Sequence, residues 1–215
     1  MKITSKISRK TIVTLSCMAL FLISCSEEET LITDVEAKMD QSSVKLHSRG
    51  VSDGLASPES AVRIKYFIDS EMPVEWIEAI HKAALVWSNT TRSINMSPTS
   101  LKSNANFNFN FIEESPRYSS SPAGAEFPNE NGDVGTKVDI NSGYIPQLEQ
   151  SVPVLTPKLR EYILIHELGH VLGYTHFTNL SFMPPRFTEE EEKWSGMSEA
   201  DIKLIRNDFP NIDPR

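Results

Sequence analysis

The chain has 215 residues, of which 39% are hydrophobic and 23% are charged, and its net charge at neutral pH is −8. This length supports one medium-sized hydrophobic core and hardly two. The acidic balance argues against a protein that binds the backbone of a nucleic acid, because such a protein needs a basic patch to neutralise phosphates.

The first 24 residues have the pattern of a secretory signal peptide. Four basic residues open the chain, and the mostly apolar run from Thr11 to Ser24 is too short to span a membrane comfortably. The run ends in Leu-Ile-Ser-Cys25, which resembles the lipobox of a bacterial lipoprotein. The resemblance implies that Cys25 is acylated and becomes the mature N-terminus. A free thiol at Cys25 after an ordinary signal peptide is the alternative.

Removal of residues 1–24 would leave 17 basic against 29 acidic residues, a net charge of −12. Cys17 would be lost with the signal and Cys25 would carry lipid, so we expect a mature domain without a disulfide. Residues 25–60 are predicted to be the acylated N-terminus and a flexible polar tether. The residues after Cys25 resemble outer-membrane sorting and surface-export signals, which implies a lipid-anchored protein of the cell envelope, in the outer membrane and facing outward. A solvated charge run without such an address is the alternative.

The globular part is predicted to occupy residues 61–215 and to open with a strand and a helix. Apolar and charged residues alternate over Val62–Asp69, as in a half-buried strand. Pro73–Asn89 is predicted to be a helix, and His81 is expected on its solvent face. The apolar stripe of this helix is predicted to consist of Val74, Ile77, Ile80, Ala84 and Trp87.

Three segments in the middle of the chain have strand-like patterns. Phe107–Phe111 alternates strictly, and Lys137–Asn141 is predicted to be another strand. Ala123–Pro128 is stopped by proline, as edge strands tend to be, although a plain loop fits this segment about as well.

Two more helices are predicted in the last third of the chain. Thr156 should cap the first, with Pro157 at its first position. Its buried side is predicted to consist of Leu159, Ile163, Leu164, Leu168 and Val171. Ser198–Asp201 is a capping-box-like start to a final helix that runs through about Asn207.

The stretch from His166 to His176 reads H-E-x-x-H-x-x-G-x-x-H. On a helix, His166 and His170 project from one face and can bind one zinc ion, and Glu167 can reach a zinc-bound water without being a ligand. If the helix continued, His176 would lie about 240° round the axis from His170. Gly173 with a positive φ would end the helix and let His176 return as the third ligand. Three histidines leave the fourth zinc position open, which is the arrangement of a catalytic site.

Five fixed positions make a chance match on the order of one in a hundred thousand for a chain of this size. An ordinary amphipathic helix with two buried, hydrogen-bonded histidines is the alternative.

This long motif followed by a methionine-containing turn is the signature of the metzincin metallopeptidases, and the chain resembles that group here. The turn is S-F-M-P-P-R-F, with Met183 as its third residue. The resemblance implies that Met183 is a structural support beneath the histidines. Met183, Pro185 and Phe187 have a spacing similar to that of the matrixin branch, which implies that Pro185 and Phe187 line a substrate pocket.

The resemblance implies an α+β catalytic domain. Its expected parts are a twisted mixed sheet, two long helices above the cleft, and a smaller irregular lower part that ends in a helix. It also implies a zinc-dependent endopeptidase with one catalytic Zn²⁺, held by His166, His170 and His176. Glu167 would be the general base for a metal-activated water, and an extended protein or peptide substrate would pair with the edge strand at Ala123–Pro128. No motif indicates calcium, and we expect a monomer.

Several features depart from the known branches of this group. Phe177, which follows the third histidine, is none of the residues common at that position, and no tyrosine lies two residues after Met183. Only His47 and His81 remain outside the motif, too few for the second, structural zinc site of matrixins, and no cysteine is available for a cysteine switch. The motif therefore indicates the superfamily and leaves the branch open.

Two other functions remain open at this point. One is a non-catalytic surface lipoprotein that uses the same fold as a binding module, although a decayed enzyme commonly loses its base or a ligand and Glu167 is intact. The other is a zinc hydrolase with a non-peptide substrate.

Overall fold

The computed structural model describes residues 54–113, 121–144, 154–176, 178–185, 187 and 189–212. The predicted signal peptide, Cys25, His47, most of the tether and Phe177 lie outside these residues. The elements run in the order α1 (Pro58–Ala61), β1 (Ile64–Ile68), α2 (Val74–Ser88), β2 (Met96–Pro98), η2 (Lys102–Asn104), β3 (Phe107–Ile112), β4 (Ala123–Ala125), β5 (Lys137–Asn141), α3 (Pro157–Val171), η3 (Glu189–Lys193) and α4 (Glu199–Asp208).

One mixed sheet organises the domain, with strand order β2-β1-β3-β5-β4. The pairs β1–β2, β1–β3 and β3–β5 are parallel, whereas β4 runs antiparallel to β5 and forms an edge of the sheet. The predicted edge strand is therefore present, although it is confined to Ala123–Ala125. Met96–Pro98 was not predicted as a strand, because three residues ending in proline carry too little alternation to be recognised.

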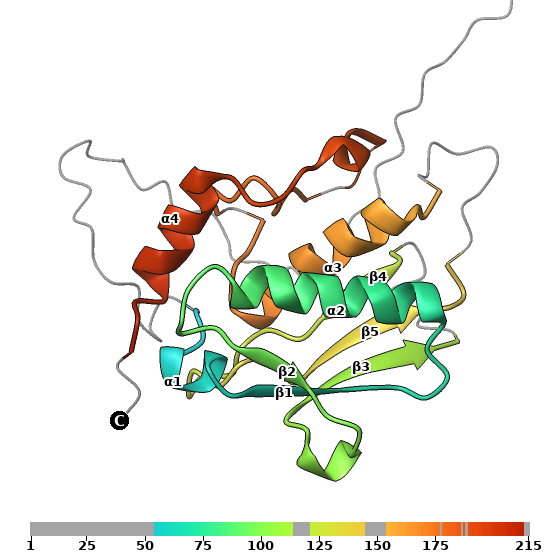
Figure 1. The fold of residues 1–215 in the computed structure, drawn as a ribbon, viewed down its shortest axis with the longest axis horizontal. Coiled ribbons are helices and arrows are strands. Elements are labelled where there is room, and N and C mark those ends of the chain that lie inside the picture. Colours follow the sequence, from blue (N-terminus) through green and yellow to red (C-terminus); the bar gives the residue numbers. More distant parts are fainter. Residues whose placement is uncertain are drawn as a thin grey trace, which may run out of the picture.

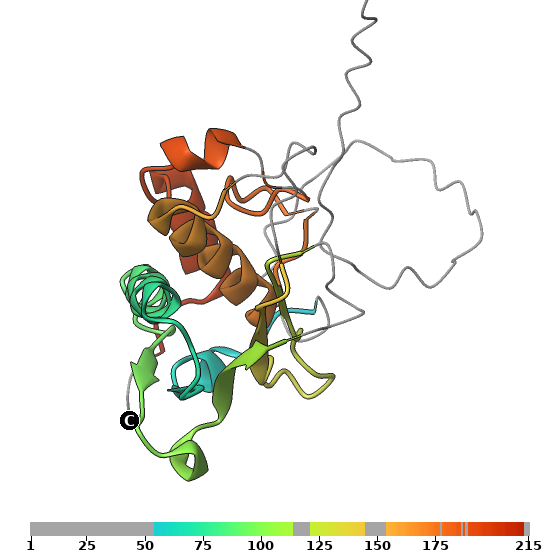
Figure 2. The ribbon, with the colours of Figure 1, turned by 90° about the vertical axis from the view of Figure 1, so that its right-hand side faces the viewer.

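The long helices α2 and α3 lie on the same side of the sheet and pack against each other (Figures 1 and 2). The alternation of β3 and β5 places Phe107, Phe109, Val138 and Ile140 in the buried core. Helix α4 is the last element of the chain (Figure 1). The predicted α+β class, with its mixed sheet, two long helices and final helix, is confirmed. Within the described residues, every helix is too short or too polar to cross a lipid bilayer.

The buried stripe of α2 differs from the predicted one at its start. Val74 is 66% exposed, so this part of the prediction was wrong. The predicted Ile80, Ala84 and Trp87 are buried, and the helix also buries Trp76, Ala79 and Ala83. The short side chains of the alanines give a weak apolar signal in the sequence. His81 is exposed as predicted, and its Nδ1 lies 2.7 Å from the hydroxyl of Tyr66.

The packed part of the chain begins before the predicted boundary at residue 61. Leu55 and Ala56 are buried, and the Ala56 amide donates to the Leu172 carbonyl at 3.0 Å. Ser57 caps the short helix α1 by accepting from the Ser60 amide. The small and polar residues of this segment are typical of a tether, but its two apolar residues pack on the end of α3.

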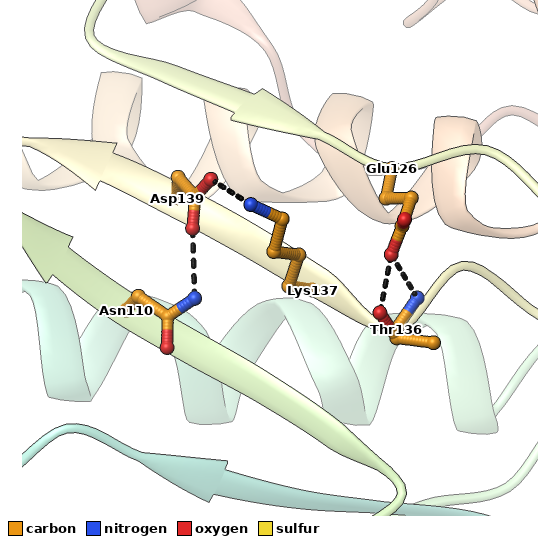
Figure 3. A network of polar contacts seen from close by, with 5 residues as sticks. All are labelled: Asn110, Glu126, Thr136, Lys137 and Asp139. Atoms are coloured by element: carbon orange, nitrogen blue, oxygen red, sulfur yellow. Dashed lines mark hydrogen bonds and ion pairs between the residues drawn. The ribbon is translucent and has the colours of Figure 1, made fainter. Parts of the chain in front are cut away.

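The face of the sheet opposite the helices is polar around β5 (Figure 3). Asp139 is only 6% exposed, and it accepts from Asn110 Nδ2 on β3 and from Lys137 Nζ, both at 2.7 Å. The Glu126 carboxylate accepts from the amide and the hydroxyl of Thr136. These bonds satisfy a buried carboxylate and hold the chain that follows β4 beside the start of β5.

Gly173 ends helix α3 with φ +99°. The Gly173 amide donates to the His170 carbonyl and the Tyr174 amide to the Gly169 carbonyl, both at 2.9 Å, which is the bond pattern of a Schellman motif. A Cβ at Gly173 would lie 2.2 Å from the Gly54 carbonyl oxygen and 2.6 Å from the Leu55 Cα. The glycine is thus required by its backbone conformation, as the sequence indicated, and also by the N-terminal segment that crosses it.

We expect Gly173→Ala to destabilise the protein by more than about 2 kcal/mol, because it adds a backbone collision to the strain of a positive φ. Gly196→Ala is the matched control. Gly196 has φ +118° with nothing within 4 Å of its Cβ position, so this substitution should cost only about 1 kcal/mol. Chemical denaturation of the two variants measures the difference. Equal losses would show that the close approach to Gly54 contributes nothing.

Candidate metal centre

Helix α3 places two histidines side by side in the interior. Thr156 caps the helix by accepting from the Leu159 amide at 3.2 Å, and Pro157 occupies its first turn, as predicted. His166 and His170 are 0% and 3% exposed, and their ring centroids are 4.6 Å apart. The buried side of α3 contains all five predicted apolar residues.

The Schellman turn returns the chain so that His176 faces the other two histidines. The Nε2 atoms of His166 and His176 are 3.2 Å apart, and one nitrogen from each of the three rings lies within 4.8 Å of the others. Two nitrogens bound at 2.0–2.1 Å to one tetrahedral zinc ion would be about 3.3 Å apart. Among the described residues, this histidine cluster is the group whose donor atoms fit a metal ion.

Backbone carbonyls set the protonation of two of the rings. His166 Nδ1 is 3.0 Å from the Phe182 carbonyl, and His170 Nδ1 is 2.8 Å from the Tyr174 carbonyl. A carbonyl can only accept, so each Nδ1 must carry the proton. This leaves the Nε2 lone pair of each ring available to a metal, the tautomer that zinc ligands need.

Burial keeps these two rings neutral. It lowers the pKa of His166 well below 6.5, and the neighbouring histidines act in the same direction. For His170, burial lowers the pKa to about 4, against the opposing effect of the hydrogen bond to the Tyr174 carbonyl. Both histidines therefore offer neutral nitrogen ligands at neutral pH.

Glu167 follows the first histidine on α3 and is fully buried. It lies within the same helical turn as the cluster, on an element whose position is fixed by the core. The sequence motif predicts that this carboxylate takes up a proton from a group held by the three histidines.

The loop of residues 181–185, the Met183 loop, packs directly beneath α3. Met183 is 1% exposed, and a Cβ on Gly169 would lie 2.6 Å from the Met183 sulfur. Gly169 lies between the two helical histidines in sequence, so its missing side chain is what admits the sulfur. Trp87 joins the same region, since its Nε1 donates to the Ile165 carbonyl at 3.0 Å and its ring contacts Phe182 edge-on.

The two residues predicted to line a substrate pocket lie in different environments. Phe187 is 8% exposed. Its ring centroid lies 4.9 Å from that of His166 and 5.9 Å from that of Tyr162. Pro185 is exposed. The ring centroid of Phe127 lies 4.8 Å from that of His170. Neither Phe127 nor Tyr162 was predicted to be a site residue. The available signals were an aromatic residue just after the edge strand, for Phe127, and an aromatic residue one helical turn before His166, for Tyr162.

No protein-family model and no curated protein sequence matches the chain. Solved structures do match. Two structures of myroilysin each match with a TM-score of 0.42. The first is 12% identical, and the match covers 69% of this chain and 93% of that chain. The second is 11% identical, and the match covers 77% of this chain and 98% of that chain. High choriolytic enzyme 1, a hatching enzyme and zinc-protease of the medaka fish Oryzias latipes, is 15% identical with a TM-score of 0.41, covering 80% of this chain and 98% of its own. Likeness at this level assigns neither a family nor an activity to this chain.

The metal-free protein should lose stability as the pH falls from 7 to 5. Unfolded histidine titrates near 6.5 whereas folded His170 titrates near 4, so the unfolded state binds more protons over this interval. The contribution of His170 is fully present above pH 6.5 and is lost progressively towards pH 4, which gives roughly 2 kcal/mol between pH 7 and 5. His166 acts in the same direction.

Urea denaturation of the metal-free protein at the two pH values measures this loss. The variant His170→Gln should show a smaller pH dependence, because it lacks one of the two buried groups. A wild-type stability that does not change between pH 7 and 5 would contradict the buried, neutral state of these rings.

Proposed function

We propose that the chain is a zinc-dependent endopeptidase that hydrolyses peptide bonds of extended protein substrates. The observation that carries this proposal is the cluster of His166, His170 and His176, together with the burial of Glu167, which directly follows His166 on α3. Three histidine ligands fit tetrahedral zinc with one position left for water or substrate, and this ligand set is typical of catalytic zinc.

The chain's own residues would divide the chemistry between them. Zinc, when bound by the three histidines, would polarise the scissile carbonyl and lower the pKa of a water towards about 7. Glu167 would take a proton from the attacking water as general base and then deliver it to the leaving amine. The carbonyl partners of His166 and His170 would hold both rings in one orientation and tautomer, while burial would keep the rings neutral.

The edge strand β4 supports an extended substrate. The Glu126 amide donates to the Lys137 carbonyl and the Asn141 amide to the Pro122 carbonyl. In an antiparallel ladder, bonding alternates from residue to residue, so Ala123 and Ala125 direct their backbone groups away from β5. Ser121 Oγ already donates to the Ala123 carbonyl at 2.6 Å. The Ala125 amide and carbonyl are then the groups suited to pair with a substrate strand.

Phe187 supports a specificity pocket next to the metal centre. Its ring touches His166 and stands edge-on to Tyr162, which in turn contacts Trp194. A substrate side chain next to the scissile bond would meet these aromatic faces. Pro185, being exposed, would contribute the outer rim of the pocket.

We further propose that the domain acts as a lipid-anchored monomer of the cell envelope, held in the outer membrane and facing outward. The support comes from the pattern of residues 1–25 and from the acidic run after Cys25. Radiolabelled palmitate should be incorporated into the full chain and not into the variant Cys25→Ser.

Glu167→Ala should lower the rate of peptide cleavage by roughly a thousandfold or more, because it removes the general base. Zinc binding should persist, since all three histidines remain. Cleavage of a diverse peptide pool read by mass spectrometry, together with the zinc content, measures both effects. Glu161→Ala on the same helix is the control and should keep its activity. Full activity in Glu167→Ala would refute the mechanism, and a folded, zinc-loaded wild type that cleaves nothing would favour a binding module.

Ala125→Pro should reduce kcat/KM for extended peptides by roughly fivefold to tenfold, because it removes one backbone donor from the outer edge of β4. The bonds of β4 to β5 remain, so thermal stability should change little. Gly124→Pro is the contrasting variant, since its amide faces β5 and its loss should lower Tm. Unchanged kinetics in a folded Ala125→Pro would show that substrates do not pair with this edge.

A further inference from the structure

We infer that Asp201, at the start of α4, is a positioning residue for the metal centre. It holds Ser181, and thereby the Phe182 carbonyl that orients His166. The inference rests on the proposed role of His166 as a metal ligand and not on the cleavage of peptides.

Asp201 is only 3% exposed and accepts four hydrogen bonds from two separate segments. The amide and the hydroxyl of Ser198, the N-cap residue of α4, donate to Oδ2 at 2.8 and 2.6 Å. The Ser181 amide donates to Oδ1 at 2.8 Å, and the Ser181 hydroxyl donates to Oδ2 at 2.6 Å.

The capping box explains only half of this arrangement. A capping box needs a side chain that reaches back to the N-cap residue, which the bonds from Ser198 provide. The bonds from Ser181 cross from α4 to the Met183 loop, and one carboxylate oxygen is committed to that loop alone. The same hydrogen bonds lower the pKa of Asp201 against the effect of its burial, so the group is ionised at neutral pH and bonds to charge are the stronger kind.

The loop that Asp201 holds reaches the metal centre by two contacts. Phe182 directly follows Ser181, and its carbonyl accepts from His166 Nδ1 at 3.0 Å. Met183 comes next and places its sulfur against Gly169 between the two helical histidines. Release of Ser181 would therefore loosen the group that fixes the tautomer and the ring orientation of His166. Loss of such an outer partner typically lowers metal affinity 10- to 100-fold.

The chain offers a matched pair of variants to test this inference. Ser181→Ala and Ser198→Ala each remove one hydroxyl that donates to the same Asp201 oxygen at the same distance, 2.6 Å. The first cuts the link to the Met183 loop, and the second weakens only the cap of α4. Both should reduce the stability of the metal-free protein, as measured by denaturation.

The readout is metal binding without substrate. Zinc affinity is measured by competition with a chelator, and the visible absorption spectrum of the Co²⁺-substituted protein reports the ligand geometry. We expect Ser181→Ala to lose about tenfold in zinc affinity and to change the cobalt spectrum, and Ser198→Ala to match the wild type in both. Asp201→Asn should lose 10- to 100-fold, because an amide offers one acceptor oxygen where the carboxylate offers two.

Equal effects of the two serine variants on zinc affinity would overturn the inference, because they would show that Asp201 acts through stability alone. A wild-type chain that does not bind zinc would overturn it together with the metal centre. If zinc binds and the serine variants differ as expected while no peptide is cleaved, the endopeptidase proposal fails and the role of Asp201 stands.

Discussion

The close contact between Gly173 and the backbone of Gly54 and Leu55 is the constraint on which the candidate site depends. Only a glycine both tolerates this contact and adopts the positive φ that ends α3 in a tight turn. The turn has three effects within a few residues. It satisfies the last helical carbonyls, it directs His176 back to the helical histidines, and it presents the Tyr174 carbonyl to His170. A bulkier residue in place of Gly173 would disturb all three together, since they share one short piece of backbone.

Trp87 provides a second, rigid support for this arrangement. Its indole N–H donates to the Ile165 carbonyl, its ring stacks on Tyr174 and it meets Phe182 edge-on. One buried side chain of α2 thus contacts the helix before the first histidine, the turn after the second and the loop beneath both. Close-packed interiors resist displacement, so these contacts restrict the positions of all the ligand-bearing segments.

The sequence predicted the parts of the fold and of the site that depend on local patterns. The α3 cap at Thr156, the strand over residues 137–141 and the histidine spacing all follow from side chains a few residues apart. What it could not predict depends on long-range packing. The burial of Leu55 requires knowing that α3 ends beneath it, and the second function of Asp201 requires knowing that Ser181 approaches α4. Neither contact leaves a periodic signal in the chain.

The choice of hydrogen-bond partners around the centre also bears on the proposed chemistry. His166 and His170 both donate to backbone carbonyls, which orient a ring without adding the negative charge that a carboxylate partner would bring. The ligands therefore remain neutral, and a bound zinc ion would keep more of its positive charge for polarising a carbonyl group. Glu167 is then the carboxyl group that the motif places beside the ligands.

Asp201 supports the same centre from a distance, where four hydrogen bonds satisfy its charge and Ser181 and Phe182 separate it from His166. Under the proposed function, this separation lets one carboxylate act in proton transfer while the other only holds the structure.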